Sequence, residues 1–431
     1  MTRYAGPLSV PEADGLRDSL RRAYAACRAD TESLAADLTP EDQTVQTMTD
    51  ASPAKWHRAH VTWFFEAVIL AQYATGYTPY DEGFFYLFNS YYEALGAKYP
   101  RPQRGLVSRP TVETIAAYRA HVDDAMDRFM AEAEPETWAA AAPLVELGIA
   151  HEEQHQELLL TDILHVFAHN PLWPAFRPPV PAPDRPAPAR GWVDHPGGTV
   201  EIGARADAFA YDNEEPRHEV RLYPFRLADR LVTNGEWLAF MADDGYRRPE
   251  FWLSDGWAAA NREDWAAPLY WHKVDGRWHQ MTLGGLLPVD EHAPVCHVSH
   301  YEADAFAAWA GRRLPSEAEW EVFAADHAPR GNTAGTGWLR PVAADPAAPA
   351  PRQLYGDVWE WTRSPYGPYP GYRPPAGAIG EYNGKFMANQ MVLRGGSAVT
   401  PDGHARATYR NFFYPHQRWQ FMGLRLAEDA G

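Results

Sequence analysis

The first 177 residues show the hydrophobic pattern of helices. Apolar side chains recur every three or four residues and glycine is scarce, as in helices that bury one face. The pattern predicts four helices, at about 11–38, from Pro53 onward, at 111–133 and from 136 to Asn170. Asp50 and Ser52 precede Pro53 and predict a helix start with proline at its first position. Four such helices predict a bundle, which can hold a metal ion between facing helices.

Beyond residue 177 the pattern changes. Residues 178–190 are rich in proline and alanine, a composition that excludes a helix or central strand and predicts a semi-rigid linker. Residues 191–431 contain short β-like segments, glycine turns and many tryptophans and tyrosines. We therefore predict a helical domain over 1–177, a linker over 178–190 and a loop-rich α+β domain over 191–431.

Composition narrows the classes of partner. Among 431 residues, 57 are acidic and 39 basic, a formal charge of −18, which argues against nucleic acid or an anionic membrane as the main partner. The N-terminal residues lack the pattern of a secretory signal. The longest apolar stretch contains Glu66 and Gln72 and is too short to span a bilayer. We therefore expect a soluble cytoplasmic protein.

The strongest local motif runs from His151 to His155. On a helix these two histidines share a face and could bind one metal ion. The motif also matches the zinc-protease pattern H-E-x-x-H, in which Glu152 would be the general base. Glu153 and the lack of a third downstream histidine argue against a protease. The alternative is a pair of ordinary helix histidines, because the same spacing recurs at residues 165 and 169.

A third ligand could come from the predicted second helix. His60 is in phase with Trp56 and Trp63 and would face the interior, whereas His57 borders Arg58 and is expected to face outward. Three neutral imidazoles leave open positions on a metal, so Fe(II) could also bind a substrate and dioxygen. The alternative for His60 is a hydrogen-bonded core histidine.

Other candidates are less specific. The phenols of Tyr91 and Tyr92 could donate protons, and nearby arginines such as Arg101 could bind a carboxylate, although such residues usually serve packing or solvation. The two cysteines, Cys27 and Cys296, cannot form a disulfide framework or a cysteine-based metal site. We expect Cys296 to be structural.

Several motifs taken together resemble a known family. In the first domain they are AHVTWFFE at 59–66 and HEEQHQE at 151–157; in the second they are RLPSEAEWE at 313–321, GDVWEW at 356–361, LRGGS at 393–397 and GLR at 423–425. The chain is thereby similar, over nearly its whole length, to hercynine oxygenases (ergothioneine sulfoxide synthases). The resemblance implies a DinB-like four-helix bundle followed by a loop-rich, C-type-lectin-like formylglycine-generating-enzyme/sulfatase-modifying-factor domain.

The resemblance also implies roles for individual residues. The iron ligands would be His60, His151 and His155. Other positions match residues that contact substrates or deliver protons: Gln154 and Asn411 for hercynine, Tyr91 and Tyr92 for proton delivery, and Arg101 for the carboxylate of the sulfur donor. The aromatic rings of Phe412 and Phe413, beside Asn411, would suit the trimethylammonium group of hercynine.

The implied reaction is an Fe(II)- and O2-dependent formation of a C–S bond between hercynine C2 and a thiol, in ergothioneine biosynthesis. Phe413 and Gln417 stand where one branch of the family has an aspartate and an arginine for γ-glutamylcysteine, which favours cysteine as the donor. A selenoneine synthase, which joins hercynine to a selenosugar, remains an alternative. An enzyme of the ovothiol route, a formylglycine-generating enzyme and a non-catalytic binding module fit less well.

Overall fold

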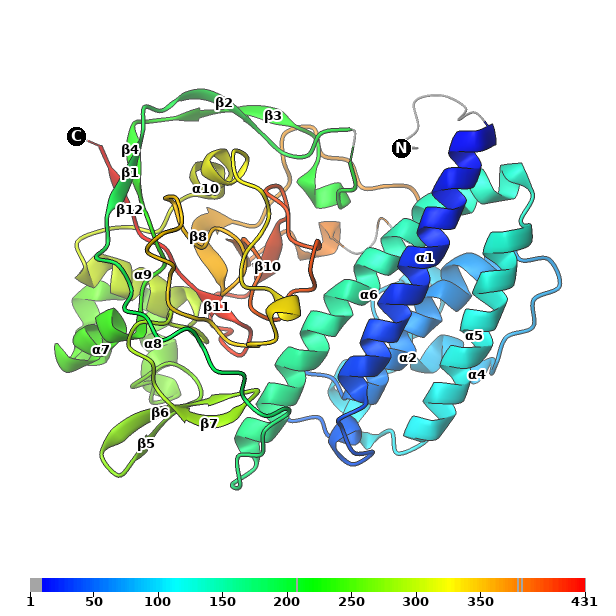
Figure 1. Ribbon diagram of the computed structural model, residues 1–431, viewed down its shortest axis with the longest axis horizontal. Coiled ribbons are helices and arrows are strands. Elements are labelled where there is room, and N and C mark those ends of the chain that lie inside the picture. The colour runs from blue at the N-terminus through cyan, green and yellow to red at the C-terminus, as the bar shows by residue number, and fades with distance from the viewer. Residues whose placement is uncertain (1–9, 207, 378–379, 381–382, 431) are drawn as a thin grey trace. The chain divides into compact units, whose positions relative to one another are not determined.

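The computed structural model describes residues 10–206, 208–377, 380 and 383–430. It divides into two compact units, one comprising residues 1–170 and 375–382 and the other residues 171–374 and 383–431. The first unit is helical, and the second combines small sheets, short helices and long loops (Figure 1). This architecture confirms the predicted fold class. None of the described helices combines the length and apolar character needed to cross a bilayer.

The helical unit is built around one buried helix. Its helices are α1 (Val10–Ala35), α2 (Ala54–Phe64), the π-helical segment η2 (Phe65–Leu70), α3 (Ala71–Tyr73), α4 (Gly83–Leu87), α5 (Val112–Glu132) and α6 (Pro135–His169). Helices α1, α2, α5 and α6 lie side by side (Figure 1). Every residue from Ala54 to Leu70 is buried, because α2 packs against both α5 and α6. A polar side chain on α2 therefore needs a partner inside the bundle.

The predicted helix starts have different outcomes. Thr111, at which the third helix was predicted to start, is the N-cap of α5, and its side chain accepts a hydrogen bond from the Thr114 N–H. The prediction for α2 is wrong: Pro53 is the N-cap residue, the helix begins one residue later, and no side chain caps it. The Ser52 N–H donates to Asp162 at 2.7 Å, and the Ser52 hydroxyl accepts from Arg104. Tertiary partners thus use the groups that a local cap would need.

Among its described residues, the second unit contains four small sheets. Its strands are β1 (Trp192–His195), β2 (Gly198–Ile202), β3 (His218–Leu222), β4 (Phe225–Ala228), β5 (Trp271–Val274), β6 (Arg277–Thr282), β7 (Gly285–Pro288), β8 (Trp359–Pro365), β9 (Met391–Arg394), β10 (Asn411–Phe413), β11 (Met422–Gly423) and β12 (Ala427–Asp429). The strand orders are β1-β4-β12, β10-β9-β8-β11, β2-β3 and β5-β6-β7. The pairs are antiparallel except β11 with β8. Four helices accompany them: α7 (Asn234–Ala242), α8 (Ser254–Arg262), α9 (His300–Trp309) and α10 (Glu317–Ala324).

Two motifs on which the family resemblance is based, RLPSEAEWE at 313–321 and LRGGS at 393–397, have structural roles in this unit. Ser316 and Glu319 form a capping box that starts α10, as this spacing favours. Glu317 accepts from Arg394 and Arg410 in the buried interior. A charged side chain in such a core is tolerated when it is paired and hydrogen-bonded. These motifs therefore stabilise the loop-rich unit and present β10 at one edge of its four-stranded sheet.

The proline-rich segment 178–190 contains neither helix nor strand, as its composition predicts. Within its unit it is held by side chains: Arg185 donates to the Ala343 carbonyl and pairs with Asp345, and Arg340 donates to the Val180 carbonyl. The extended segment is thus fastened along a loop of the second unit.

Candidate metal centre

Three histidines from two helices converge inside the helical unit. His60 lies on α2, and His151 and His155 lie one turn apart on α6. One ring nitrogen from each forms a set whose members lie within 4.8 Å of one another. The ring centroids are 5.1, 4.9 and 4.7 Å apart for the pairs 60–151, 60–155 and 151–155. The structure therefore brings the three predicted ligands to one point.

Hydrogen bonds orient two of the three rings. His60 Nδ1 lies 2.6 Å from the Phe88 carbonyl oxygen, so it donates there and leaves Nε2 unprotonated. His155 Nδ1 lies 2.8 Å from Nδ1 of His57. Nδ1 of His151 is buried and has no hydrogen-bond partner among the residues that the structure describes. A buried ring nitrogen without a hydrogen-bond partner, next to two imidazoles of fixed orientation, fits a site at which the histidines bind a metal ion.

Burial keeps the three imidazoles neutral. It lowers the pKa of His151 to about 4. It also holds the pKa values of His60 and His155 well below the usual range, with His151 adding repulsion in both cases. Neutral imidazole is the form that binds a metal. The three side chains are therefore ready to act as ligands at neutral pH.

The expectation that His57 faces outward is wrong. Its side chain is 4% exposed, and Nε2 lies 3.0 Å from the Asp162 carboxylate on α6. The neighbouring Arg58 is buried as well and pairs with Glu32. Helical phase alone misplaces both residues, because α2 is surrounded by other helices and has no solvent-facing side.

Aromatic rings enclose His60. The ring of His60 is stacked between Trp56, at 4.6 Å, and Trp63, at 5.6 Å. The guanidinium of Arg104 lies 3.3 Å from the centroid of Trp56. Burial, together with the charge of Arg101, lowers the pKa of Arg104 to about 9. The side chain of His60 is thus held rigidly, with a buried positive charge behind the indole.

The predicted tyrosine pair has two different environments. Tyr91 is partly exposed and its hydroxyl accepts from Arg101 at 2.7 Å, and Arg101 also donates to the Asp50 carbonyl. Tyr92 is buried and packs 5.7 Å from Trp63. The bond from Arg101 holds the Tyr91 oxygen, which acts as the acceptor, in a fixed position.

Glu152 cannot act as the base of a zinc protease. It is fully buried and accepts from Arg28 at 2.8 Å, from Arg119 at 3.0 Å and from Thr31 at 2.7 Å. Burial raises the pKa of the Glu152 carboxyl, but the two guanidinium groups outweigh burial and hold it below its ordinary value. The Glu152 carboxylate is therefore engaged in hydrogen bonds within the core of the bundle. Gln154, two residues along α6, is partly exposed.

Two family models cover the two units. Residues 23–159 match the DinB superfamily, and residues 178–430 match the sulfatase-modifying factor enzyme 1-like domain. The hercynine oxygenase of Mycolicibacterium smegmatis is 37% identical over 310 residues, which cover 66% of this chain and 71% of the relative. That of Mycolicibacterium thermoresistibile is 34% identical over 411 residues, or 88% of each chain. The chain belongs to the hercynine oxygenase family.

Membership in the hercynine oxygenase family confirms the resemblance drawn from the motifs and makes the chain an oxygenase. A further relative, ergothioneine biosynthesis protein 1 of Schizosaccharomyces pombe, is 26% identical over 234 residues. That match covers 51% of this chain and 28% of the yeast protein.

The remaining predicted residues lie on β10 in the second unit. Asn411, Phe412 and Phe413 are partly exposed. Phe412 stacks on Tyr366 at 4.1 Å, and Phe413 meets Trp419 edge to face at 5.7 Å. Both rings are therefore packed against aromatic neighbours while part of each residue stays exposed.

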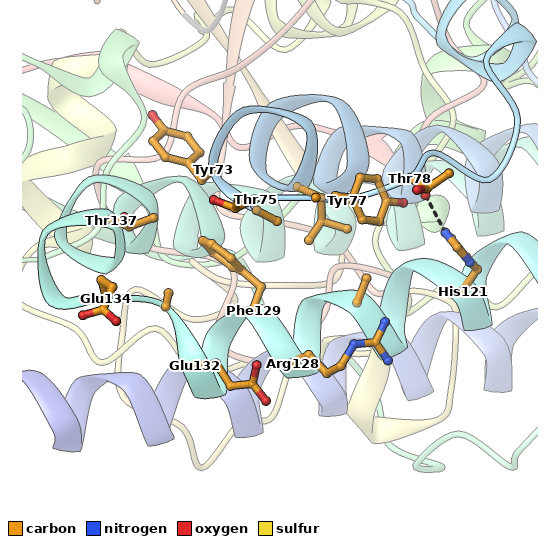
Figure 2. Close-up of a pocket in the computed structure, with 15 residues that line it drawn as sticks. Tyr73, Thr75, Tyr77, Thr78, His121, Arg128, Phe129, Glu132, Glu134 and Thr137 are labelled. Carbon is orange, nitrogen blue, oxygen red and sulfur yellow. Dashed lines mark hydrogen bonds between the residues drawn. The ribbon is translucent and has the colours of Figure 1, made fainter.

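A separate cavity of about 560 Å³ lies between α5, the turn after α3 and the start of α6. Figure 2 shows its aromatic lining, including Tyr73, Tyr77 and Phe129, and the hydrogen bond from His121 to the Thr78 carbonyl. None of the three clustered histidines lines it. The cavity is therefore distinct from the candidate metal centre.

The pattern along the sequence missed three parts of the centre: His57, Asp162 and Arg104. Asp162 follows His155 by seven residues, which is two helical turns, so a carboxylate on the ligand face of α6 was a detectable signal. The position of Arg104 against Trp56 depends on the path of a loop and has no signal in the local sequence.

Proposed function

We propose that this chain is an Fe(II)- and O2-dependent sulfoxide synthase that joins hercynine C2 to the sulfur of cysteine in ergothioneine biosynthesis. One C–H bond and one S–H bond are broken, a C–S bond and an S=O bond form, and O2 supplies the sulfoxide oxygen and the oxygen of one water. The proposal depends above all on the cluster of His60, His151 and His155, of which the first two are buried and the third is half-buried. It is supported by family membership and by the names of the bacterial and yeast relatives.

The residues fit an iron ion bound by three neutral nitrogens. Such a ligand set preserves the positive charge of Fe(II) and leaves positions for a thiolate, an imidazole and dioxygen, which is the chemistry the ion supplies when bound. Arg104 contributes a further buried positive charge behind Trp56. The positive electrostatic environment favours the anionic thiolate over the neutral thiol.

Tyr91 and Tyr92 are proposed as the proton donors, and Arg101 as the group that receives the carboxylate of the sulfur donor. Arg101 already holds the Tyr91 oxygen at 2.7 Å, so a carboxylate bound by this guanidinium would lie next to the phenol. A proton held at the Tyr91 oxygen is then within one hydrogen bond of the substrate. In the same proposal, Gln154, Asn411, Phe412 and Phe413 bind hercynine through amide and aromatic contacts.

The test begins with purified chain loaded anaerobically with Fe(II). Hercynine and cysteine are added under air, and product mass and oxygen uptake are recorded. We expect a hercynine–cysteine sulfoxide in the wild type and loss of both iron and turnover in His151→Ala. Absence of product in iron-loaded wild type, or retained turnover in His151→Ala, would contradict the proposal.

Two further comparisons in the same assay test the identity of the sulfur donor and the role of the tyrosines. Replacing cysteine with γ-glutamylcysteine or a selenosugar identifies the donor, and we expect cysteine to react fastest because Phe413 and Gln417 offer no charge for a second carboxylate. The variants Tyr91→Phe and Tyr92→Phe should divert product toward oxidised cysteine. An unchanged product ratio in both variants would reject the proton-donor role.

A further inference from the structure

Two residues that are not among the proposed ligands, His57 and Asp162, form a chain of hydrogen bonds that ends at His155. His57 on α2 places Nε2 3.0 Å from Oδ2 of Asp162 and Nδ1 2.8 Å from Nδ1 of His155. The side chains of His57 and Asp162 are 4% and 5% exposed. Since His155 and Asp162 are two turns apart on α6, His57 spans the gap between them from the facing helix. We call His57 and Asp162 the positioning pair.

The order of donors and acceptors assigns a tautomer to each ring. A carboxylate only accepts hydrogen bonds, so His57 donates from Nε2 to Asp162. A His155 that binds a metal through Nε2 carries its hydrogen on Nδ1, which then donates to Nδ1 of His57 at 2.8 Å. Nε2 of His155 is left with its lone pair free, which is the state that a metal ligand requires.

Asp162 is itself held in place. The same Oδ2 atom accepts from the Ser52 N–H at 2.7 Å, two residues before α2 begins. The carboxylate therefore ties the start of α2 to the C-terminal third of α6, the two helices that carry all three clustered histidines. A rotation of the Asp162 side chain would break both contacts at once.

The three clustered histidines are supported in different ways. A main-chain carbonyl orients His60, and Nδ1 of His151 has no partner in the described part of the chain. Only the orientation of His155, among these three, depends on a second side chain. An apolar residue in place of His57 could fill the same space. It would remove the acceptor for Nδ1 of His155, and the tautomer of His155 would no longer be fixed.

We propose that the His57–Asp162 pair positions His155 and fixes its tautomer, and thereby sets the affinity of the centre for its metal. His57 and Asp162 are positioning residues, because they act through His155 and do not themselves ligate. This inference rests on the metal site of the proposed function. Loss of such a partner typically lowers metal affinity about 10- to 100-fold.

The experiment titrates the full-length metal-free chain with Co(II), whose absorption reports binding without turnover. His57→Asn keeps an acceptor near the position of Nδ1, His57→Gln keeps a donor near Nε2, and His57→Phe keeps only bulk. We expect His57→Asn to stay near the wild-type affinity and the other two to bind about 10- to 100-fold more weakly. His121→Phe removes a histidine of the same unit that donates to the Thr78 carbonyl, and it should bind Co(II) like the wild type.

Urea unfolding of each metal-free variant accompanies the titration. A purely structural role would change unfolding without separating His57→Asn from His57→Gln in metal affinity, and that result would overturn the proposal. Should His57→Phe fail to fold, the Asn and Gln variants still decide. Wild type that binds no Co(II) would reject the metal site itself, and with it the proposed function. Wild-type binding with equal affinities in the two amide variants rejects the positioning role alone.

Discussion

At the scale of single residues, neighbours on α6 face different partners. His151 and His155 lie in the metal centre, while Glu152 between them turns to Arg28 and Arg119 in the core. The chain therefore matches the H-E-x-x-H pattern of zinc proteases, but its glutamate is an ion-pair partner in the core and not a general base. The burial of Glu152 and its two guanidinium partners decide that use, and neither is visible in the five residues themselves.

Glu152→Gln should destabilise the helical unit strongly, because it removes the charge between two buried arginines. Breaking a buried ion pair costs about 3–5 kcal/mol, to be measured as the free energy of unfolding in urea. Glu132→Gln, at an exposed site on α5, is the control and should change it by no more than about 0.5 kcal/mol. An equally small effect in Glu152→Gln would contradict the assigned role.

His165 provides a pH dependence outside the metal centre. Burial, with a smaller contribution from His169, lowers the pKa of His165 from 6.5 to about 4. Between these values the unfolded chain takes up a proton that the folded chain does not. Stability is therefore fully present above about pH 6.5 and falls as the pH drops toward 4, by about 1.4 kcal/mol per pH unit for this group.

His165→Gln should thus flatten the fall in unfolding free energy of the metal-free chain between pH 6.5 and 4. Urea midpoints measured at several pH values give the slope. His416→Gln, at an exposed histidine of the second unit, should keep the wild-type slope. An identical slope in both variants would mean that His165 does not contribute.

At the scale of elements, the close approach of α6 to α2 and η2 positions the histidines. Gly148, one turn before His151, allows this approach, since a Cβ there would lie 2.5 Å from Cε1 of Phe65 and 3.1 Å from Cε1 of Phe64. Both phenylalanines are fully buried, so their rings have no free space to enter. The small residue therefore sets the distance between the helices that carry the ligands.

Gly148→Ala should destabilise the protein although alanine favours helix by about 1 kcal/mol. Overpacking of a tight core costs about 1–3 kcal/mol, and we expect this cost to exceed the gain in helix propensity. Gly15→Ala in α1, where a Cβ meets no atom within 4 Å, should instead raise stability. Thermal unfolding of the two variants in parallel checks the opposite signs, and stabilisation by both would contradict the packing argument.

At the scale of the whole molecule, the two units supply different chemistry. The helical unit carries the histidine cluster of the candidate metal centre. The second unit carries the polar and aromatic residues of β10. Each has its own core, with a buried cluster around α2 in one and around the sheets in the other. Under the proposed function, we therefore expect iron binding and the contribution of Asn411 to hercynine binding to be separable by mutation.

Asn411→Ala should raise the KM for hercynine about 10-fold, as expected for one lost hydrogen bond to a charged ligand. Its iron content should equal that of the wild type. Asn261→Ala, at an exposed position of α8, serves as the control for the removal of an amide. A lowered iron content in Asn411→Ala would contradict the separation of roles.

The sequence predicted much of this arrangement for identifiable reasons. Helical spacing placed His151 and His155 together, the tryptophan phase placed His60 inside, and Thr111 marked the start of α5. It failed where a residue's partner is distant along the chain. Ser52 lost its capping role to Asp162, and His57 was assigned to solvent although α6 covers it.

The sequence by itself determined the helical bundle and the loop-rich second domain, because periodicity and composition can be read without knowing which segments meet. Its motifs indicated the family and, through that resemblance, the three clustered histidines. Only the tertiary structure decided that Glu152 is a core ion-pair partner and that His57 and Asp162 support His155. The physical reason is that burial and hydrogen bonding depend on which surfaces meet, and those surfaces belong to helices that are distant in the sequence.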